Sequence, residues 1–209
     1  MISNKERRHS TIGYTHYWYR EQEIAKPIFE TIVVDFIKVV DYLKLMGIEL
    51  AGGNGSGTPE ISTILVCFNG IEHCGHEKRK LHITWPAKGA KGVDPRAGEL
   101  SKTVVDKPWF AGAMLLTRTC GGDCSHETFY FPQRDPKSDA NGFNFCKTAY
   151  KPYDLAVNAF LIIAKHYLKD ALKVHSDGEG VDWEDGRRVC EIVLRYGKDF
   201  ELDHEKGGD

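Results

Sequence analysis

The sequence lacks any apolar run long enough to cross a membrane. A spanning helix needs about 20 consecutive apolar residues, and the longest run here, residues 156–164, is about half that length and contains Asn158. Arg7 and Arg8 near the start are not followed by an apolar stretch, so we expect no secretory leader. These absences argue against membrane insertion and secretion, and they predict a cytoplasmic protein with reduced cysteines.

The sequence also lacks an excess of charge of either sign. Its 28 Lys and Arg residues against 30 Asp and Glu residues give a formal net charge of −2. Proteins that bind nucleic acid by neutralising many phosphates are normally more basic. The charge balance therefore argues against nucleic acid as a partner, although residues 78–80 form a short basic run.

Repeats and low-complexity tracts are absent, and hydrophobic patterning predicts one α+β domain over residues 1–209. β-branched and aromatic residues between turn signals predict strands at residues 11–20, 61–68, 126–131 and 172–175. Apolar residues at helical spacing predict helices at residues 27–46, 152–169 and 183–196. We expect a mainly antiparallel sheet covered by about three helices, in which the second and third strands pair.

Residues 71–125 differ in character from the segments on either side. Short strand candidates at residues 81–85 and 113–119 are separated by a polar segment that contains glycine and proline, and few aliphatic side chains are present. The segment holds three of the six cysteines. We therefore expect an inserted subdomain, resembling a zinc knuckle with β-structure, that needs a further source of stability.

Two pairs of residues in this insertion predict a structural zinc site formed by Cys74, His76, Cys120 and Cys124. Structural zinc is held tetrahedrally by four sulfur or nitrogen ligands, and its binding contributes directly to folding. The spacing of Cys120 and Cys124 is usual for a ligand pair, whereas that of Cys74 and His76 is tighter than usual.

Other ligand sets remain open. His73 or His126 could replace His76, and a site with only three protein ligands would leave a position for a catalytic water. A segment without any ion is the simpler alternative. The remaining cysteines lie in apolar neighbourhoods and are expected to pack in the core: Cys67, Cys146 and Cys190.

A dispersed set of polar residues forms the candidate catalytic or ligand-binding site. His16 lies on the first predicted strand. The other members fall at or near the ends of predicted elements, where sites on α+β folds are often assembled: His126, Glu127, Lys147 and Asp177. Gathered together, an imidazole, carboxylates and an ammonium group could bind an anion or transfer a proton. The alternative is that these residues only cap, turn or face solvent.

Four short sequences in and near the C-terminal third resemble a set of uncharacterised bacteriophage and bacterial proteins. They lie at residues 142–148, 151–154, 176–178 and Trp183, with residues 126–129 as a further match. The resemblance implies a phage or prophage setting and supplies no activity. The zinc-like insertion departs from that pattern.

These observations favour a zinc-stabilised binding or accessory protein, directed at a host protein or at a small anionic ligand such as a nucleotide. One alternative is a phosphoester or nucleotide hydrolase that uses the five polar residues above. A second alternative is a nucleic-acid-binding module that uses residues 78–80 and Arg118 of the insertion. The sequence leaves open whether the protein is an enzyme.

We expect protein purified without chelator to contain about one zinc ion per chain, because four ligands of suitable chemistry are present. Elemental analysis measures this directly, and a metal-free protein would contradict it. Replacing Cys120 by serine should make residues 71–125 sensitive to protease while the rest of the fold resists it.

Overall fold

The computed structural model describes residues 14–74, 80–81, 118–119, 122–136 and 141–203. The helices are α1 (Lys26–Leu45), α3 (Asp154–Leu168) and α4 (Glu184–Leu194), with short 3-10 turns η2 (Lys169–Ala171) and η3 (Gly180–Trp183). The strands are β1 (Thr15–Arg20), β2 (Leu50–Ala51), β3 (Glu60–Ile61), β4 (Leu65–Gly70), β5 (Lys80–Leu81), β6 (Arg118–Thr119), β7 (Phe129–Pro132), β8 (Phe143–Lys147) and β9 (Leu172–Ser176). Helices and antiparallel sheets confirm the predicted α+β class. No helix within these residues is long and apolar enough to span a membrane.

Strand β1 is the centre of a three-stranded antiparallel sheet with the order β8-β1-β9. Tyr17 lies opposite Phe145 on one side and opposite His175 on the other. Successive side chains of a strand face opposite sides of its sheet. The burial of β1 follows this rule, since His16 and Trp18 are buried whereas Tyr17 is only half-buried. One face of this sheet therefore belongs to the core and the other to the surface.

Strand β4 is the centre of the second sheet and pairs antiparallel with β2, β3 and β7. Its pairing with β7 confirms that the strands on either side of the predicted insertion pair antiparallel. At the end of β4, a Cβ atom on Gly70 would lie 1.9 Å from the carbonyl oxygen of Cys124. Only glycine allows the chain leaving the insertion to lie this close to the chain entering it.

Two strand predictions differ from the structure. The strand expected at residues 61–68 is divided into β3 and β4, because Ser62 forms a tight turn. The backbone N–H of Ser62 donates to the carbonyl of Leu65 at 2.9 Å, and the N–H of Leu65 donates to the Ser62 hydroxyl at 3.2 Å. The second difference is that the sequence analysis predicts no element at strands β2 and β8.

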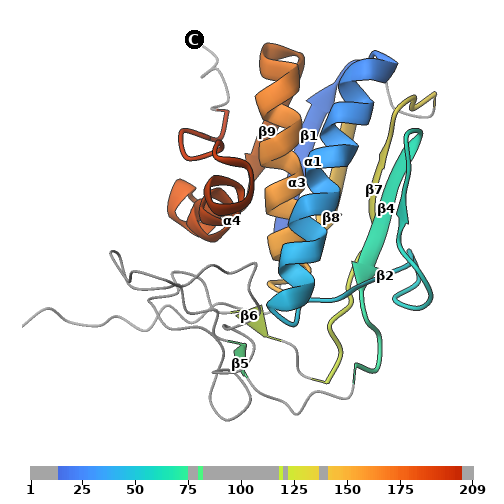
Figure 1. Cartoon of the computed structure of the whole chain (residues 1–209), viewed down its shortest axis with the longest axis vertical. Helices are drawn as coiled ribbons and strands as arrows, with labels where there is room; N and C mark the ends of the chain where they lie inside the picture. The colour runs from blue at the N-terminus through green and yellow to red at the C-terminus, as the bar shows by residue number, and fades with distance from the viewer. Residues whose placement is uncertain (1–13, 75–79, 82–117, 120–121, 137–140, 204–209) are drawn as a thin grey trace, which may run out of the picture.

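Helix α1 follows its sequence signals closely. Pro27 occupies its first turn, where a missing N–H costs no hydrogen bond. Gly47 lies just beyond its end with φ of 73°, a left-handed conformation that favours glycine. Helices α1 and α3 run side by side, with β1, β8 and β9 behind them and β4 and β7 along the right-hand side of Figure 1.

Helix α3 is the centre of the core, as its all-round apolar pattern predicts. Residues 154–164 are all buried. The ring of Phe160 lies 5.0 Å from that of Phe36 on α1, and 5.1 Å and 4.9 Å from those of Phe129 and Phe131 on β7. This helix therefore joins the packing of α1 to that of the second sheet.

Replacing Phe160 by alanine should lower the free energy of unfolding by about 3–5 kcal/mol, because a fully buried ring leaves a cavity among three others. Chemical denaturation measures the loss. The matched control is Phe145→Ala, whose side chain is 50% exposed and should cost less than about 1 kcal/mol. Similar losses for the two variants would contradict the central position of α3.

Candidate functional site

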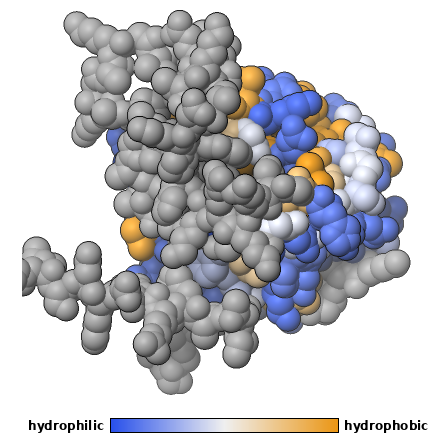
Figure 2. Space-filling model, turned by 90° about the horizontal axis from the view of Figure 1, so that it is seen from below, coloured by the Kyte–Doolittle hydropathy of each residue, from blue (hydrophilic) through white to orange (hydrophobic). Residues whose placement is uncertain are grey.

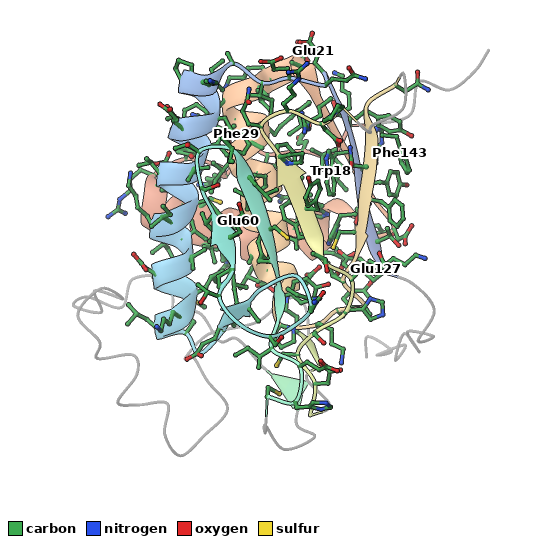
Figure 3. The ribbon with its side chains drawn as sticks, turned by 90° about the vertical axis from the view of Figure 1, so that its right-hand side faces the viewer. Trp18, Glu21, Phe29, Glu60, Glu127 and Phe143 are labelled. Atoms are coloured by element: carbon green, nitrogen blue, oxygen red, sulfur yellow. The ribbon has the colours of Figure 1, made fainter. Side chains whose placement is uncertain are left out.

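Three of the polar residues that the sequence analysis groups together meet at the lower end of β8. The Nδ1 atom of His126 lies 2.8 Å from the carbonyl oxygen of Lys147. The carboxylate of Glu127 accepts the backbone N–H of Lys147 at 2.8 Å and lies 3.9 Å from its ammonium group. Figure 3 shows Glu127 at this end of β8. Seen from below, the surface of the described residues is largely hydrophilic with scattered apolar residues (Figure 2).

The structure does not bring Asp177 and His16 into this group. Asp177 extends the ladder of β9, because its carboxylate accepts the backbone N–H of Thr15 at 2.9 Å and its own N–H donates to the Thr15 carbonyl at 3.0 Å. Thr15 lies opposite Lys147, so the backbones at Asp177 and Lys147 are two strand spacings apart, about 10 Å. His16, the next residue of β1, is fully buried on the opposite face.

His16 belongs to a buried polar network centred on Asp154, the first residue of α3. The Nε2 atom of His16 lies 2.7 Å from Asp154 Oδ1, and the hydroxyl of Thr148 donates to the same oxygen at 2.6 Å. Arg118 donates to Asp154 Oδ2 from Nε at 3.2 Å and from Nη2 at 2.9 Å, and its Nη1 donates to Asp185 at 2.9 Å. Burial alone would raise the pKa of Asp154, but Arg118, His16 and Thr148 together hold that pKa below its ordinary value.

The network corrects one of the sequence hypotheses. Arg118, assigned there to a nucleic-acid-binding surface, has no exposed side-chain area and cannot contact an external ligand. It instead ties β6, within the predicted insertion, to the first turns of α3 and α4. A buried guanidinium needs such paired carboxylates to offset its loss of hydration, and the N-terminal turn of a helix favours a carboxylate.

A hydroxyl, an imidazole and a carboxylate follow one another in this network. Ser176 Oγ lies 3.0 Å from Nδ1 of His16, whose other nitrogen contacts Asp154. The same order activates a nucleophile in serine hydrolases. Here Arg118 neutralises the carboxylate, which weakens its stabilisation of an imidazolium, and His16 has no exposed surface. The arrangement favours a structural role, in which His16 joins β1 to β9 and α3.

Two of the four expected zinc ligands are described, Cys74 and Cys124, whereas His76 and Cys120 lie outside the described residues. The backbone N–H of Cys124 donates to the carbonyl of Ile71 at 3.0 Å, so the two ligand-bearing segments run side by side. Within the part of the chain that the structure describes, no three potential ligands group around a common point.

The cysteines expected in the core are buried as predicted at two of three positions. Cys146 and Cys190 have no exposed area, and burial raises the pKa of both thiols far above the ordinary value. Cys67 is half-buried, and burial also raises its pKa. These thiols therefore stay protonated at neutral pH, which argues against a role as nucleophiles.

The outer side of the sheet β8-β1-β9 carries a group of aromatic residues that the sequence analysis misses. We call it the aromatic face; it is formed by Tyr17, Tyr19, Phe143, Phe145 and His175. Ring centroids are 5.7 Å apart for Tyr17 and His175, 5.3 Å for Tyr19 and Phe143, and 5.9 Å for Phe143 and Phe145. Phe145 is 50% exposed and Phe143 is 37% exposed. Figure 3 shows Phe143 on the outside of this sheet and Trp18, from the adjacent strand, turned toward the core.

Two lysines lie at opposite corners of the aromatic face. Lys147 lies opposite Thr15, and its ammonium group is 5.9 Å from the centroid of the Phe145 ring. Lys173 lies opposite Tyr19, at the other end of β1. Lys147 has one carboxylate within 4 Å and Lys173 has two, those of Asp170 and Asp203, so the two ammonium groups give the face no excess of positive charge.

Comparison of the chain with protein-family models, with curated proteins and with solved structures finds no match.

Replacing Arg118 by leucine should lower the free energy of unfolding at pH 7 by about 3–5 kcal/mol, because Asp154 and Asp185 remain buried without their cation. In the wild type, the pKa of Asp154 is lowered on folding, so its contribution is present above the ordinary pKa of about 4 and is lost as pH falls below it. Without Arg118, that pKa rises and acid favours the folded state. The difference between wild type and variant should therefore shrink from pH 7 toward pH 4 in denaturant titrations.

The matched control is Arg188→Leu, which removes a surface pair with Glu184 at 3.4 Å and should cost less than about 1 kcal/mol. An Arg118→Leu protein as stable as this control at pH 7 would show that the buried network contributes nothing to the fold.

Proposed function

We propose that the protein is a binding protein whose ligand is nucleotide-like, with a planar ring and an anionic group, and that the ligand binds to the aromatic face. The observation that carries the proposal is the set of five rings on the outer side of the sheet with an ammonium group at each end. Aromatic side chains stack on planar rings, and a lysine ammonium attracts a phosphate.

The size of the aromatic face favours such a ligand over a host protein. Three strands at about 4.8 Å spacing and five residues at about 3.3 Å rise cover roughly 14 Å by 17 Å, or about 240 Å². A stable protein–protein interface buries about 800 Å² on each partner. The face alone is therefore too small for a host protein and large enough for stacked rings.

The hydrolase alternative has less support from the geometry. Glu127 is engaged by the backbone of Lys147, Asp177 by that of Thr15, and His16 is buried on the other side of the sheet. These contacts leave His126 and Lys147 to do any acid–base chemistry at the surface.

We also propose that zinc stabilises the insertion, since the segments that carry Cys74 and Cys124 run side by side. The resemblance to phage proteins and the cytoplasmic location remain predictions from the sequence.

Replacing Lys147 by alanine should weaken binding of adenosine monophosphate about tenfold, because the ammonium group pairs with the phosphate. Isothermal titration calorimetry measures the affinity. The thermal unfolding midpoint should stay within error of wild type, because the Lys147 side chain is 47% exposed and its contact with Glu127 is 3.9 Å long.

The matched control is Lys198→Ala, another exposed lysine with a single carboxylate neighbour at 3.8 Å, which should leave binding unchanged. The wild type should bind adenosine monophosphate more tightly than it binds inorganic phosphate or adenosine alone. Equal weakening by the two variants, or no binding by the wild type, would refute the proposed function.

A further inference from the structure

The aromatic face has the layout of a platform for a short single strand of nucleic acid, and we infer that this is the ligand class of the proposed binding function, on which the inference rests. The strand would cross the sheet from the Lys147 corner of β8 to the Lys173 corner of β9. Its bases would stack on the rings of the aromatic face, and its backbone would meet one ammonium group at each end.

The spacing of the two lysines favours an oligonucleotide over a mononucleotide as the ligand. Lys147 lies opposite Thr15, and Lys173 lies opposite Tyr19, four residues further along β1 and on its other side. From the rise of a strand and the spacing between strands, the two positions are about 16 Å apart. A mononucleotide cannot meet both ammonium groups over that distance. A strand of a few nucleotides can, which is the short end of the roughly 4–16 nucleotides that single-strand-binding folds occupy.

The charge of the aromatic face favours a single strand over a duplex as the ligand. Lys147 has Glu127 at 3.9 Å, Lys173 has Asp170 at 3.3 Å and Asp203 at 3.4 Å, and the whole chain carries −2. Phosphate neutralisation, which supplies much of the affinity for duplexes, is therefore weak here. Stacking needs exposed base faces, which a single strand offers and a duplex does not. In the sequence analysis, the low net charge argues against nucleic acid as a partner. It is nevertheless compatible with this mode of binding, which depends on stacking more than on charge.

Fluorescence anisotropy with the full chain tests the inference, using a labelled oligothymidine of about eight nucleotides. Competition with thymidine monophosphate and with a duplex of the same length gives their relative affinities. The oligothymidine should bind at least about tenfold more tightly than either competitor. Two lysine–phosphate contacts predict a shallow salt dependence, with a slope of log K against log salt of about −1.4.

Variants assign the binding to the aromatic face. Phe145→Ala should weaken oligothymidine binding about tenfold, as loss of one stacking ring does. The matched control is Tyr130→Ala on β7, whose ring is 48% exposed on the other sheet and whose loss should have no effect. Lys147→Gln and Lys173→Gln should each make the salt slope shallower by about 0.7, whereas Lys198→Gln should not change it.

Four results would overturn the inference, and they can be told apart. If thymidine monophosphate binds as tightly as the oligomer, the ligand is not a single strand of nucleic acid, but the proposed binding of a nucleotide-like ligand is supported. Equal binding of duplex and single strand, with a steep salt slope, would place the contacts on phosphates rather than on rings. Self-association of the wild type that Phe145→Ala abolishes would assign the face to a second copy of the chain. If neither thymidine monophosphate nor the oligomer binds, both the inference and the proposed function fail.

Discussion

The arrangement of the fold depends on the buried carboxylate of Asp154. Two of its partners come from distant segments, His16 on β1 and Arg118 on β6, and the third, Thr148, lies six residues earlier, just after β8. An ionised carboxylate without such partners costs several kcal/mol to bury, so all three segments stabilise the packing of the first turn of α3. Arg118 also binds Asp185, and the same network therefore positions α4. Strands β1 and β6 and helices α3 and α4 are therefore joined through one buried network.

The network also determines which side chains reach the surface. A shift of one residue in strand register would exchange the two faces of the sheet. His16 bonds to Asp154 and Trp18 packs on Phe129 and Phe131, and both interactions require the even-numbered residues of β1 to face inward. Tyr17 and the other odd-numbered residues must then face outward, beside the outward residues of β8 and β9. The aromatic face is thus a consequence of the core contacts of His16 and Trp18, which fix the orientation of β1.

Local signals in the sequence were sufficient for the elements that carry their own start and stop residues or their own apolar pattern. Pro27 and Gly47 bracket α1, and the all-round apolar pattern of residues 154–164 identifies the central helix. The turn at Ser62 depends on hydrogen bonds that the β-branched run around it conceals. Strand β8 is short, and its partner β1 lies at the other end of the chain, so no local pattern marks the pairing.

The candidate site was predictable only where residue chemistry and position agree. His126, Glu127 and Lys147 are polar residues at the ends of elements, and they meet. Residue type is misleading elsewhere: Arg118 is chemically suited to a ligand and is wholly buried, whereas Phe145 is suited to a core and is half exposed. The composition of the chain counts buried and exposed residues together, whereas a ligand contacts only the side chains that are exposed at its site. In a chain of net charge −2, the register of three strands places two ammonium groups around a set of aromatic rings, and this is the surface that we propose binds the ligand. A function that depends on register can be inferred only after the long-range pairing is known.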